Sequence, residues 1–390
     1  MTAHARKILL TLHGLLGLVT GLVVFLVAIT GCGWVFKEEI EALLSDSVPI
    51  PIRAQPTIPP SQAQAVAQAV FPGHAIHGVA YSSKSNEPIE VIFYEIAPAF
   101  YQSVFIHPYQ PEVLRTVDHH SGVFAWLLDG HRYLWLPPTV GTHVVRVSVL
   151  LFLLILISGL VLWWPKNRKG ARQRLRFRWK PTTRWRRKNF DLHAITGFYV
   201  CLLALLLALT GSVMGYDWFY RTAYASLGGD QEPSFTVPAN VSGPPAPLAP
   251  PEDRLLPQLR AEQDGAVRWE IHEPISDTAS LYVEVTYQPG LYYDADYRFF
   301  DARTLAEIDV DGIYGKYAQA ELPARVMRLN YDVHVGAIGG LVGKTLAFLA
   351  SLVTASLPLT GTLLWWGRRK KQRTRSKANT QQQQPVTHVY

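Results

Sequence analysis

The sequence predicts a mainly α-helical membrane protein, in which four transmembrane helices form two parallel two-helix repeats and each repeat carries an α+β module outside the membrane. Three observations predict this fold class. Hydrophobic residues make up 48% of the 390 residues and charged residues only 17%, a balance typical of membrane proteins. Four apolar runs are long enough to cross about 30 Å of hydrocarbon, which takes roughly 20 helical residues. The first half of the chain also recurs in the second half.

The predicted elements follow the order span, module, span, twice over. The first span lies within 1–36 and follows Arg6 and Lys7, and its ITGC end loosely resembles a lipoprotein cleavage site. The run is too long for the apolar region of a signal peptide, and its repeat favours a permanent helix. The other expected segments are a first outer module at 37–139, a span at 140–164, a basic linker at 165–189, a span at 190–216, a second outer module at 217–333, a span at 334–366 and a tail at 367–390.

The placement of charge predicts the orientation. The linker PKNRKGARQRLRFRWKPTTRWRRKN holds twelve Lys and Arg residues and no acid, and the tail segment RRKKQRTRSK holds seven more. By the positive-inside rule these segments and both termini are cytoplasmic, and the two modules are periplasmic in a bacterial inner membrane. The net charge of +7 therefore reflects topology and contact with anionic lipid, and does not indicate nucleic-acid binding.

Cysteine usage excludes several metal centres. Only Cys32 and Cys201 occur, in different spans, and there is no CxxC motif. Iron–sulfur clusters, zinc ribbons and covalent c-type haem therefore have no support. A metal centre in this chain would have to use histidine.

The two halves match residue by residue in their first spans. HGLLGLVTGLVVFLVAITG aligns with HAITGFYVCLLALLLALTG, which pairs His13 with His193 at an offset of 180. The second spans of the two halves end alike, in SGLVLWWPK and TGTLLWWGR. His131 lies 28 residues before Gly159, and His334 lies 27 residues before Gly361. The outer segments repeat too, as a helical stretch followed by strand-like runs such as IEVIFYE and LYVEVTY.

Matched histidines near span ends predict two haem sites. His13 and His193 are expected together at the inner face, and His131 and His334 at the outer face. Neutral imidazole is a common axial ligand of haem, and ionisable groups in spans are kept mainly where they have a function. A single histidine at a helix end is more simply an interfacial or hydrogen-bonded residue, but that interpretation does not explain the exact repetition of the histidines. Glycine with Ser or Thr in the spans is, taken alone, more simply close helix packing.

Three further residues belong to the predicted sites. His143 has no counterpart in the last span, and it is the alternative to His131 as the ligand opposite His334, because Pro137-Pro138 interrupts any helix between His131 and His143. Arg146 and Lys344 lie near the outer ends of the inward-running spans. Their cations are candidate partners for haem propionates.

At these residues the sequence resembles the PepSY-associated transmembrane family. The resemblance rests on TLHGLLGLVTG, FIHPYQPEVL, HRYLWLP, SGLVLWWPK, DLHAITGFY, HVGAIGG and TGTLLWWGRR, and it covers nearly the whole chain. Within the family the sequence is most similar to inner-membrane ferric-siderophore reductases of ferrioxamine uptake. The resemblance implies two bound b-type haems, delivery of electrons to the periplasm and reductive release of iron. It carries the ligand role onto His13, His131, His193 and His334.

The partners expected from this hypothesis are a ferric siderophore, the lipid bilayer and a source of electrons. No dinucleotide-binding fingerprint lies on a cytoplasmic segment, so a membrane quinol or a separate reductase is expected to donate. Two rival functions remain. One is an iron or siderophore permease, which would place polar groups at mid-membrane. The other is a membrane-anchored binding or regulatory module, which would leave the paired histidines unexplained.

Overall fold

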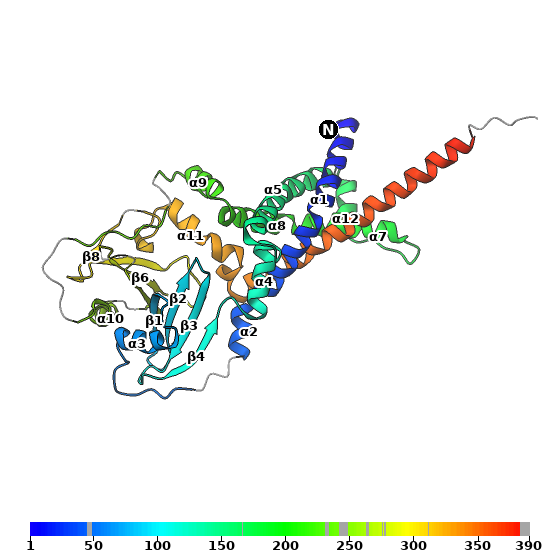
Figure 1. Cartoon of the computed structure of the whole chain (residues 1–390). Helices are drawn as coiled ribbons and strands as arrows, with labels where there is room; N and C mark the ends of the chain where they lie inside the picture. Colours follow the sequence, from blue (N-terminus) through cyan, green and yellow to red (C-terminus); the bar gives the residue numbers. More distant parts are fainter. Residues whose placement is uncertain are drawn as a thin grey trace, which may run out of the picture. The chain divides into compact units, whose positions relative to one another are not determined.

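The computed structural model describes residues 1–44, 49–165, 167–230, 234–241, 249–262, 265–274, 276, 278–310 and 312–382, and only the backbone of 168, 169, 173 and 370–382. The end of the predicted tail, residues 383–390, lies outside the described residues. The chain forms two compact units (Figure 1). The helical unit comprises Met1–Val35, Leu127–Gly215 and Leu341–Tyr390, and the sheet unit comprises Phe36–Trp126 and Tyr216–Gly340.

Four long apolar helices match the four predicted spans in number, length and composition. They are α1 (Ala3–Trp34), α5 (Pro138–Trp163), the continuous stretch Trp185–Gly215, and the segment Ala337–Arg369 that includes most of α12 (Gly340–Gln382). The third stretch is built from α7 (Trp185–Asp191), a π-helical turn η1 (Leu192–Thr196) and α8 (Gly197–Gly215). The helical unit also contains α6 (Arg168–Arg174). Helices satisfy their own backbone hydrogen bonds, which is what a span requires in hydrocarbon.

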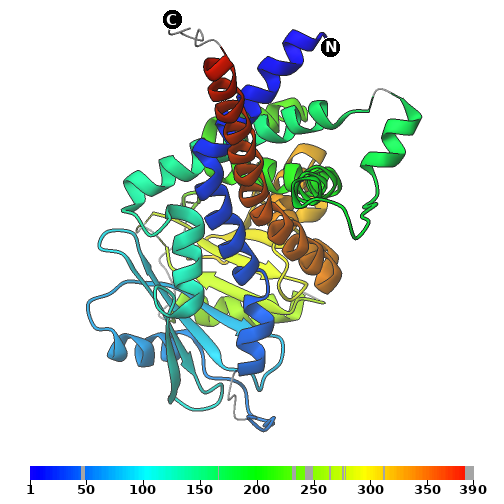
Figure 2. The same cartoon turned by 90° about the vertical axis from the view of Figure 1, so that its right-hand side faces the viewer.

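Small residues let the long helices approach closely. A Cβ on Gly21 of α1 would lie 3.3 Å from Pro358 Cβ of α12, and both views place α1 beside α12 (Figure 2). The helices α5, α8 and α12 share a small apolar core formed by Leu156, Val200, Ala204 and Ala350. Much of the remaining apolar surface faces outward, as at Leu202, which is 75% exposed. An apolar perimeter around a small-residue interface is typical of helices packed in lipid.

The sheet unit is built on one eight-stranded antiparallel sheet with the order β4-β3-β2-β1-β5-β6-β7-β8. The first four strands are β1 (Ile76–Ser82), β2 (Ile89–Glu95), β3 (Phe100–Ile106) and β4 (Val113–Asp118). The last four are β5 (Arg268–His272), β6 (Leu281–Thr286), β7 (Asp296–Phe300) and β8 (Glu307–Ile308).

Two helices cover one face of this sheet. They are α3 (Pro60–Val70) and α10 (Pro251–Glu262), and each precedes one set of four strands. Alternate residues of the strands, including Val79, Val91 and Val283, point to these helices and are fully buried with Leu255 and Leu259 of α10. This apolar layer is the core of the sheet unit. The unit also contains α2 (Lys37–Leu44), the first part of α4 (Gly122–Tyr133), α9 (Asp217–Ser226), α11 (Leu322–His334) and two 3-10 turns, η2 (Tyr317–Gln319) and η3 (Ala337–Gly339).

The strands expected from IEVIFYE and LYVEVTY are present as β2 and β6. The two central strands, β1 and β5, were not among the predicted strands. They pair antiparallel, with Gly78 opposite His272 and Ala80 opposite Glu270, and so join the two predicted modules in one sheet. An unpaired strand edge exposes backbone donors and acceptors, and this pairing removes two such edges.

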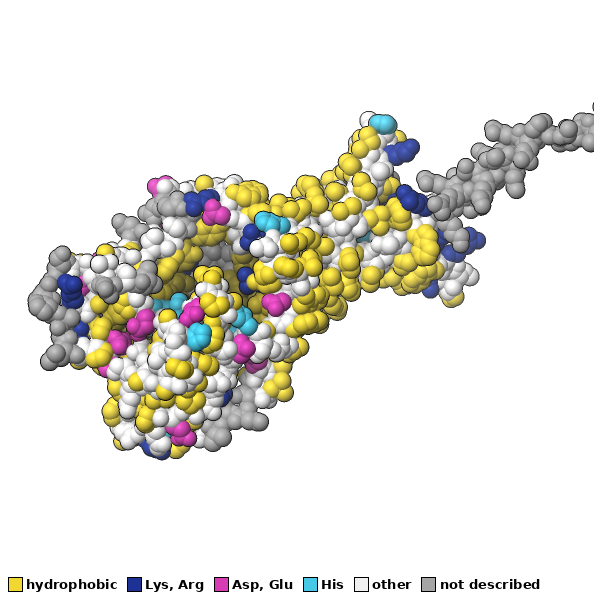
Figure 3. Space-filling view, in the orientation of Figure 1, with side chains coloured by type: hydrophobic (Ala, Val, Ile, Leu, Met, Phe, Trp, Pro, Cys, Tyr) yellow, Lys and Arg dark blue, Asp and Glu magenta, His cyan; other side chains and the backbone are white. Residues whose placement is uncertain are grey.

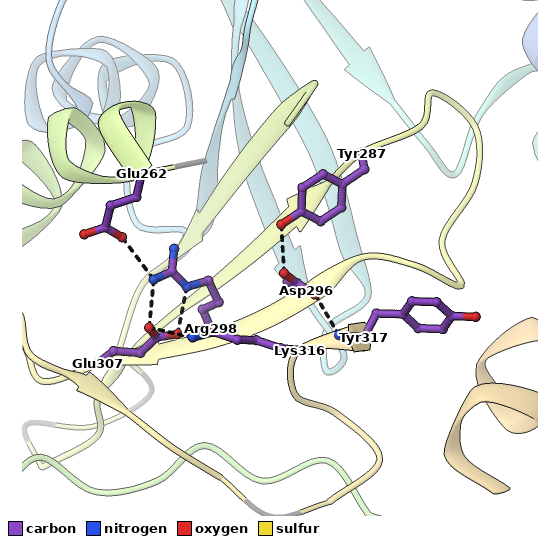
Figure 4. Close-up of polar contacts among 7 residues, drawn as sticks. All are labelled: Glu262, Tyr287, Asp296, Arg298, Glu307, Lys316 and Tyr317. Carbon is purple, nitrogen blue, oxygen red and sulfur yellow. Dashed lines mark hydrogen bonds and ion pairs between the residues drawn. The ribbon is translucent and has the colours of Figure 1, made fainter. Parts of the chain in front are cut away.

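A buried ion-pair network ties α10 to the last two strands (Figure 4). Arg298 of β7 is 4% exposed, and its Nε lies 2.8 Å from Glu307 Oε1 and its Nη2 3.1 Å from Glu262 Oε2. Lys316 Nζ binds the second Glu307 oxygen at 2.8 Å. A buried guanidinium needs such partners, because removing one of them leaves an uncompensated charge.

Candidate functional site: a histidine pair between the spans

The first histidine of the site lies on α1. His13 is half-buried, and its Nδ1 is 2.9 Å from Ser158 Oγ on α5. The Ser158 hydroxyl donates its own hydrogen to the Ile155 carbonyl at 3.0 Å. The hydroxyl oxygen must therefore accept from His13, which places the proton on Nδ1 and leaves the lone pair on Nε2.

The second histidine repeats this arrangement on the other two helices. His193 Nδ1 lies 2.9 Å from Thr360 Oγ1 of α12. The Thr360 hydroxyl lies 3.0 Å from the Leu357 carbonyl, to which it donates. The same argument puts the His193 proton on Nδ1 and the lone pair on Nε2. A hydrogen bond to one ring nitrogen is what orients a ligating histidine and fixes its tautomer.

The two rings lie close together, edge to face, inside the helical unit. The centroids of the His13 and His193 rings are 6.3 Å apart, and the ring planes meet at 83°. An imidazole nitrogen lies about 2 Å from the metal that it ligates, so two axial imidazoles on one iron have centroids roughly 6 Å apart. The described residues of this pair therefore fit a haem iron held between them.

Glycine gives each ring its place against the facing helix. A Cβ on Gly159 would lie 3.2 Å from His13 Cε1, and a Cβ on Gly361 would lie 3.3 Å from His193 Cε1. By contrast, a Cβ on Gly14 or Gly17 of α1 would meet nothing within 4 Å. The helix surface beside His13 is thus open, which suits the approach of a flat macrocycle.

The π-helical turn carries His193 and has no counterpart at His13, which lies in regular α-helix. Such turns insert one extra residue and occur frequently at functional sites. Asn189, one turn before His193, is 3% exposed and donates from Nδ2 to the Thr360 carbonyl at 3.0 Å. Asn189 and His193 therefore hold the same residue of α12 from two sides.

His131 lies at a tight corner between α4 and α5. Its Nδ1 is 2.9 Å from the Val27 carbonyl of α1, and since a carbonyl can only accept, Nδ1 carries the proton. Burial lowers the pKa of His131, so its ring is neutral at pH 7, as a haem ligand requires. The corner is strained, because Leu134 and Trp135 have φ values of 58° and 56°. Backbone strain of this kind clusters at functional sites.

The structure places the other predicted site residues as follows. His143 lies on α5 and is exposed. Arg146 is half-buried, and its Cγ lies 3.5 Å from the position of a Cβ on Gly215 of α8. Lys344 of α12 is 7% exposed. His334 is the half-buried last residue of α11 and belongs to the sheet unit. The pairing of His131 or His143 with His334 stays a prediction.

Within the described residues no group of three or more His, Cys, Asp and Glu side chains is arranged to hold a metal ion. The histidine pair is a different arrangement, since haem supplies four of its iron's ligands from the porphyrin and takes only the axial ones from protein.

Comparison with known proteins gives the family of the chain. A family model described as the PepSY-associated TM region matches residues 10–368. The chain belongs to this family. The match covers the sheet of this PepSY-associated protein and most of each of its four long helices, and it bears out the resemblance seen in the sequence motifs. No curated protein matches the chain.

Sequence reasoning missed the residues that orient the histidines of this PepSY-associated protein. Ser158 and Thr360 each precede the glycine that contacts a histidine ring, as Ser-Gly in one half and Thr-Gly in the other. Both dipeptides were interpreted as close helix packing. The sequence signal that indicates these residues is a hydroxyl side chain repeated at matching positions, because close helix packing requires a small residue but not a hydroxyl.

Proposed function

We propose that this protein is a two-haem reductase of the bacterial inner membrane, which carries electrons outward across the bilayer and reduces a ferric siderophore of the ferrioxamine type in the periplasm. His13 and His193 would hold the inner haem, and His131 with His334, or His143 in place of His131, would hold the outer one. The single observation that carries the proposal is the close pair of imidazoles, in each of which Nδ1 donates its proton to a hydroxyl and Nε2 is unprotonated.

We also infer that the two halves arose by duplication, and the contacts of the histidines support this. His13 packs on Ser158-Gly159, and His193 packs on Thr360-Gly361, with nearly equal distances in the two halves. A pseudo-twofold axis along the membrane normal would relate these contacts. The PepSY-like character of each α+β module belongs to the same proposal.

Bound haem would supply one-electron transfer at pH 7, which protein side chains do not provide. The histidines of this chain would bind the haem, and Ser158 and Thr360 would fix the imidazole tautomers. One electron converts Fe(III) in the chelate to Fe(II), which hard oxygen donors hold far less tightly, so reduction releases the metal without hydrolysis. A membrane quinol or a separate reductase would donate the electrons.

An absorption spectrum of the detergent-purified protein tests the proposal. We expect a Soret band that shifts on reduction with dithionite, two haems per chain by pyridine haemochromogen assay, and reoxidation of the reduced protein by a ferric trihydroxamate with formation of Fe(II). A colourless protein from cells well supplied with haem would refute it and favour the permease or the anchored binding module.

Removing the hydroxyl behind His193 should weaken haem binding without removing the ligand. Thr360→Val keeps the shape but leaves the Nδ1 proton of His193 without its acceptor. Loss of such an orienting partner typically lowers affinity about 10- to 100-fold. Transfer of haem to apomyoglobin should speed up correspondingly, and Ser158→Ala should act in the same way on His13.

The matched control is Thr345→Val. Thr345 is exposed on the same helix, and its hydroxyl donates to the Leu341 carbonyl one turn earlier. Equal rates of haem transfer from the Thr360 and Thr345 variants would mean that the hydroxyl does not orient a ligand.

A further inference from the structure

The end of α5 brings together two arginines from other helices. The helix ends at Trp163, and Trp164 leaves helical geometry before Pro165. The last carbonyl groups of a helix have no partners inside it and need donors from elsewhere. At this end the donors are the guanidinium groups of Arg6 on α1 and of Arg174 on α6.

Both guanidinium groups bind the same carbonyl group. Arg6 Nη2 lies 3.4 Å from the Leu162 carbonyl oxygen, and Arg174 Nη1 lies 3.5 Å from the same atom. Arg174 Nη1 also donates to the Trp163 carbonyl and, at 3.4 Å, to the Trp164 carbonyl. Two like charges are therefore bridged by a single oxygen atom at one helix end.

The short helix α6 carries Arg174 back to the end of α5. The Asn167 side chain accepts from the Gly170 backbone N–H at 2.8 Å and so caps the start of α6. Arg174 is the last residue of α6, and its side chain reaches over the helix that the chain has just left. Arg6 reaches the same point from α1, which packs along α5. Three helices of the helical unit thus meet here.

Helix capping explains one of these cations but not both. The C-terminal end of a helix carries roughly −0.5 of an elementary charge, which a single cation compensates. Two guanidinium groups, each fully charged at pH 7, leave an excess of about 1.5 positive charges. Burial and the charge of Arg6 both lower the pKa of Arg174, and no carboxylate among the described residues offsets these two effects.

The helical unit has few acids with which to balance this excess. Its sequence contains only Asp129 and Asp191. Asp191 is 5% exposed and already has two partners, since its Oδ2 lies 2.9 Å from Arg187 Nε and accepts from the Trp179 indole at 3.2 Å. Asp191 is therefore not available to a second pair of arginines.

Asp129 belongs to the opposite end of the unit. It lies on α4 close to His131, whose ring binds the Val27 carbonyl of α1. Val27 is roughly 20 residues from Arg6 along α1, which is about 30 Å at 1.5 Å per residue. In the part of the chain that the structure describes, neither Arg6 nor Arg174 forms an ion pair with a carboxylate. Their charge is thus balanced only in part, by the carbonyl groups of α5.

The two arginines lie where a membrane presents phosphate groups. Arg6 is at the start of one long apolar helix, and Leu162 is at the end of another. The headgroup region of a bilayer borders the ends of spanning helices, and a guanidinium matches the geometry of a phosphate. Trp164 is 67% exposed next to the arginines, as is typical of a ring at headgroup level. Figure 3 shows Lys and Arg side chains at this end of the helical unit, where the N-terminus lies, beside the apolar surface of the long helices.

The surroundings favour a lipid over a free phosphate ion. Ile8 on α1 and Val161 on α5 are exposed apolar residues close in sequence to the arginine contacts. Acyl chains cover such surface, whereas an inorganic ion gains nothing from it. The charge excess also favours an anionic lipid, because a zwitterionic headgroup carries an ammonium group that two guanidinium groups repel.

We propose that Arg6 and Arg174 form a binding site for the phosphate group of an anionic phospholipid, such as phosphatidylglycerol, in the leaflet where α1 begins and α5 ends. The carbonyl groups of α5 hold the two guanidinium groups in place, and the other N–H groups of both arginines bind the phosphate oxygens. The bound lipid stabilises the chain reversal between α5 and α6. The site is independent of haem, so its test and the test of the proposed function are separate.

Native mass spectrometry of the full-length protein in non-ionic detergent counts the bound lipids and measures the affinity of the first one. The probes are phosphatidylglycerol and phosphatidylcholine with the same acyl chains, and inorganic phosphate in large excess is the competitor. We expect the first phosphatidylglycerol to bind about tenfold or more tightly than phosphatidylcholine, because its pairing with the guanidinium groups is charge-assisted and not opposed by an ammonium group. Inorganic phosphate should not displace it.

Replacing Arg6 and Arg174 by Gln together should lower the affinity for phosphatidylglycerol to that for phosphatidylcholine. Gln removes the charge but keeps a side-chain N–H for the carbonyl groups of α5. The control is the double variant Arg176→Gln with Arg178→Gln, which removes the same charge from two exposed arginines of the same linker. This control should keep the preference for phosphatidylglycerol.

Three results would overturn the inference. The first is equal affinity of the unmodified protein for the two lipids, whether or not the variants fold. The second is an equal loss of affinity in both double variants, which would mean that the lipid responds to the total charge of the linker. The third is displacement of phosphatidylglycerol by inorganic phosphate, which would show a site for the free ion.

Discussion

Replacement of His193 by alanine is expected to remove about half of the haem that we propose the protein binds, because the proposed inner site would lose one of its two axial imidazoles. His13→Ala should give the same result, since in the proposed site both rings would bind one iron. Haem per chain measured by pyridine haemochromogen should fall from two to one in either variant. The double variant should lose no more haem than either single one, because the two residues act as a unit.

His4→Ala is the control for this prediction, because His4 is an exposed residue on the same helix as His13. Added imidazole and haem should restore the lost part of the Soret absorbance in a His193→Gly variant, which a collapsed helix bundle would not permit. Full haem content in the His13 variant combined with loss in the His193 variant would show that the two rings do not share an iron.

Replacement of Arg298 by methionine should open the end of the sheet. Methionine keeps much of the volume but leaves Glu307 and Glu262 without the guanidinium. Removing one partner of a buried ion pair costs up to 5 kcal/mol, and about 3 kcal/mol is expected here because Glu262 is 40% exposed and Lys316 still pairs with Glu307. Amide hydrogen exchange of β6 and β7 should therefore speed up roughly a hundredfold.

The control is Arg303→Met, which replaces an exposed arginine in the turn after β7 and should leave these exchange rates unchanged.

The pH dependence of stability gives a second check. Burial opposes ionisation of Glu307, but Arg298 and Lys316 outweigh it and hold its pKa below the ordinary value. This stabilisation is complete above the unfolded pKa of about 4.3 and is lost as pH falls below it. The loss of stability on acidification should be smaller in the Arg298→Met variant than in the unmodified protein. If the stability of both proteins falls equally with pH, the ion-pair network is contradicted.

The spans and their histidines were predictable because both depend on local patterns. A run of apolar residues long enough to cross a bilayer specifies a helix there, whatever it packs against. Exact repetition of His13 at His193 indicated a shared role without any knowledge of contacts. The helical stretches and the outer strands of the sheet unit followed from periodicity in the same way, as at β2 and β6.

The pairing of β1 with β5 was not predictable, because it joins residues about 190 positions apart and depends on which strand edges remain unpaired. The same holds for Glu90, Glu270 and Glu284, which lie on three different strands and are aligned in one row only by the register of the sheet. Alternation in each strand was visible in the sequence, but it does not say which rows align.

The sequence by itself determined the number of spans, the doubled pattern and the histidines that are candidates for ligands, since these are properties of single segments. Only the tertiary structure decided that His13 and His193 lie edge to face and that Ser158 and Thr360 fix their tautomers. It also decided that Arg268 of β5 pairs with Glu270 of its own strand and with Glu90 of β2. The physical reason is that orientation, proton position and charge balance depend on distances between helices and between strands, and no segment contains those distances.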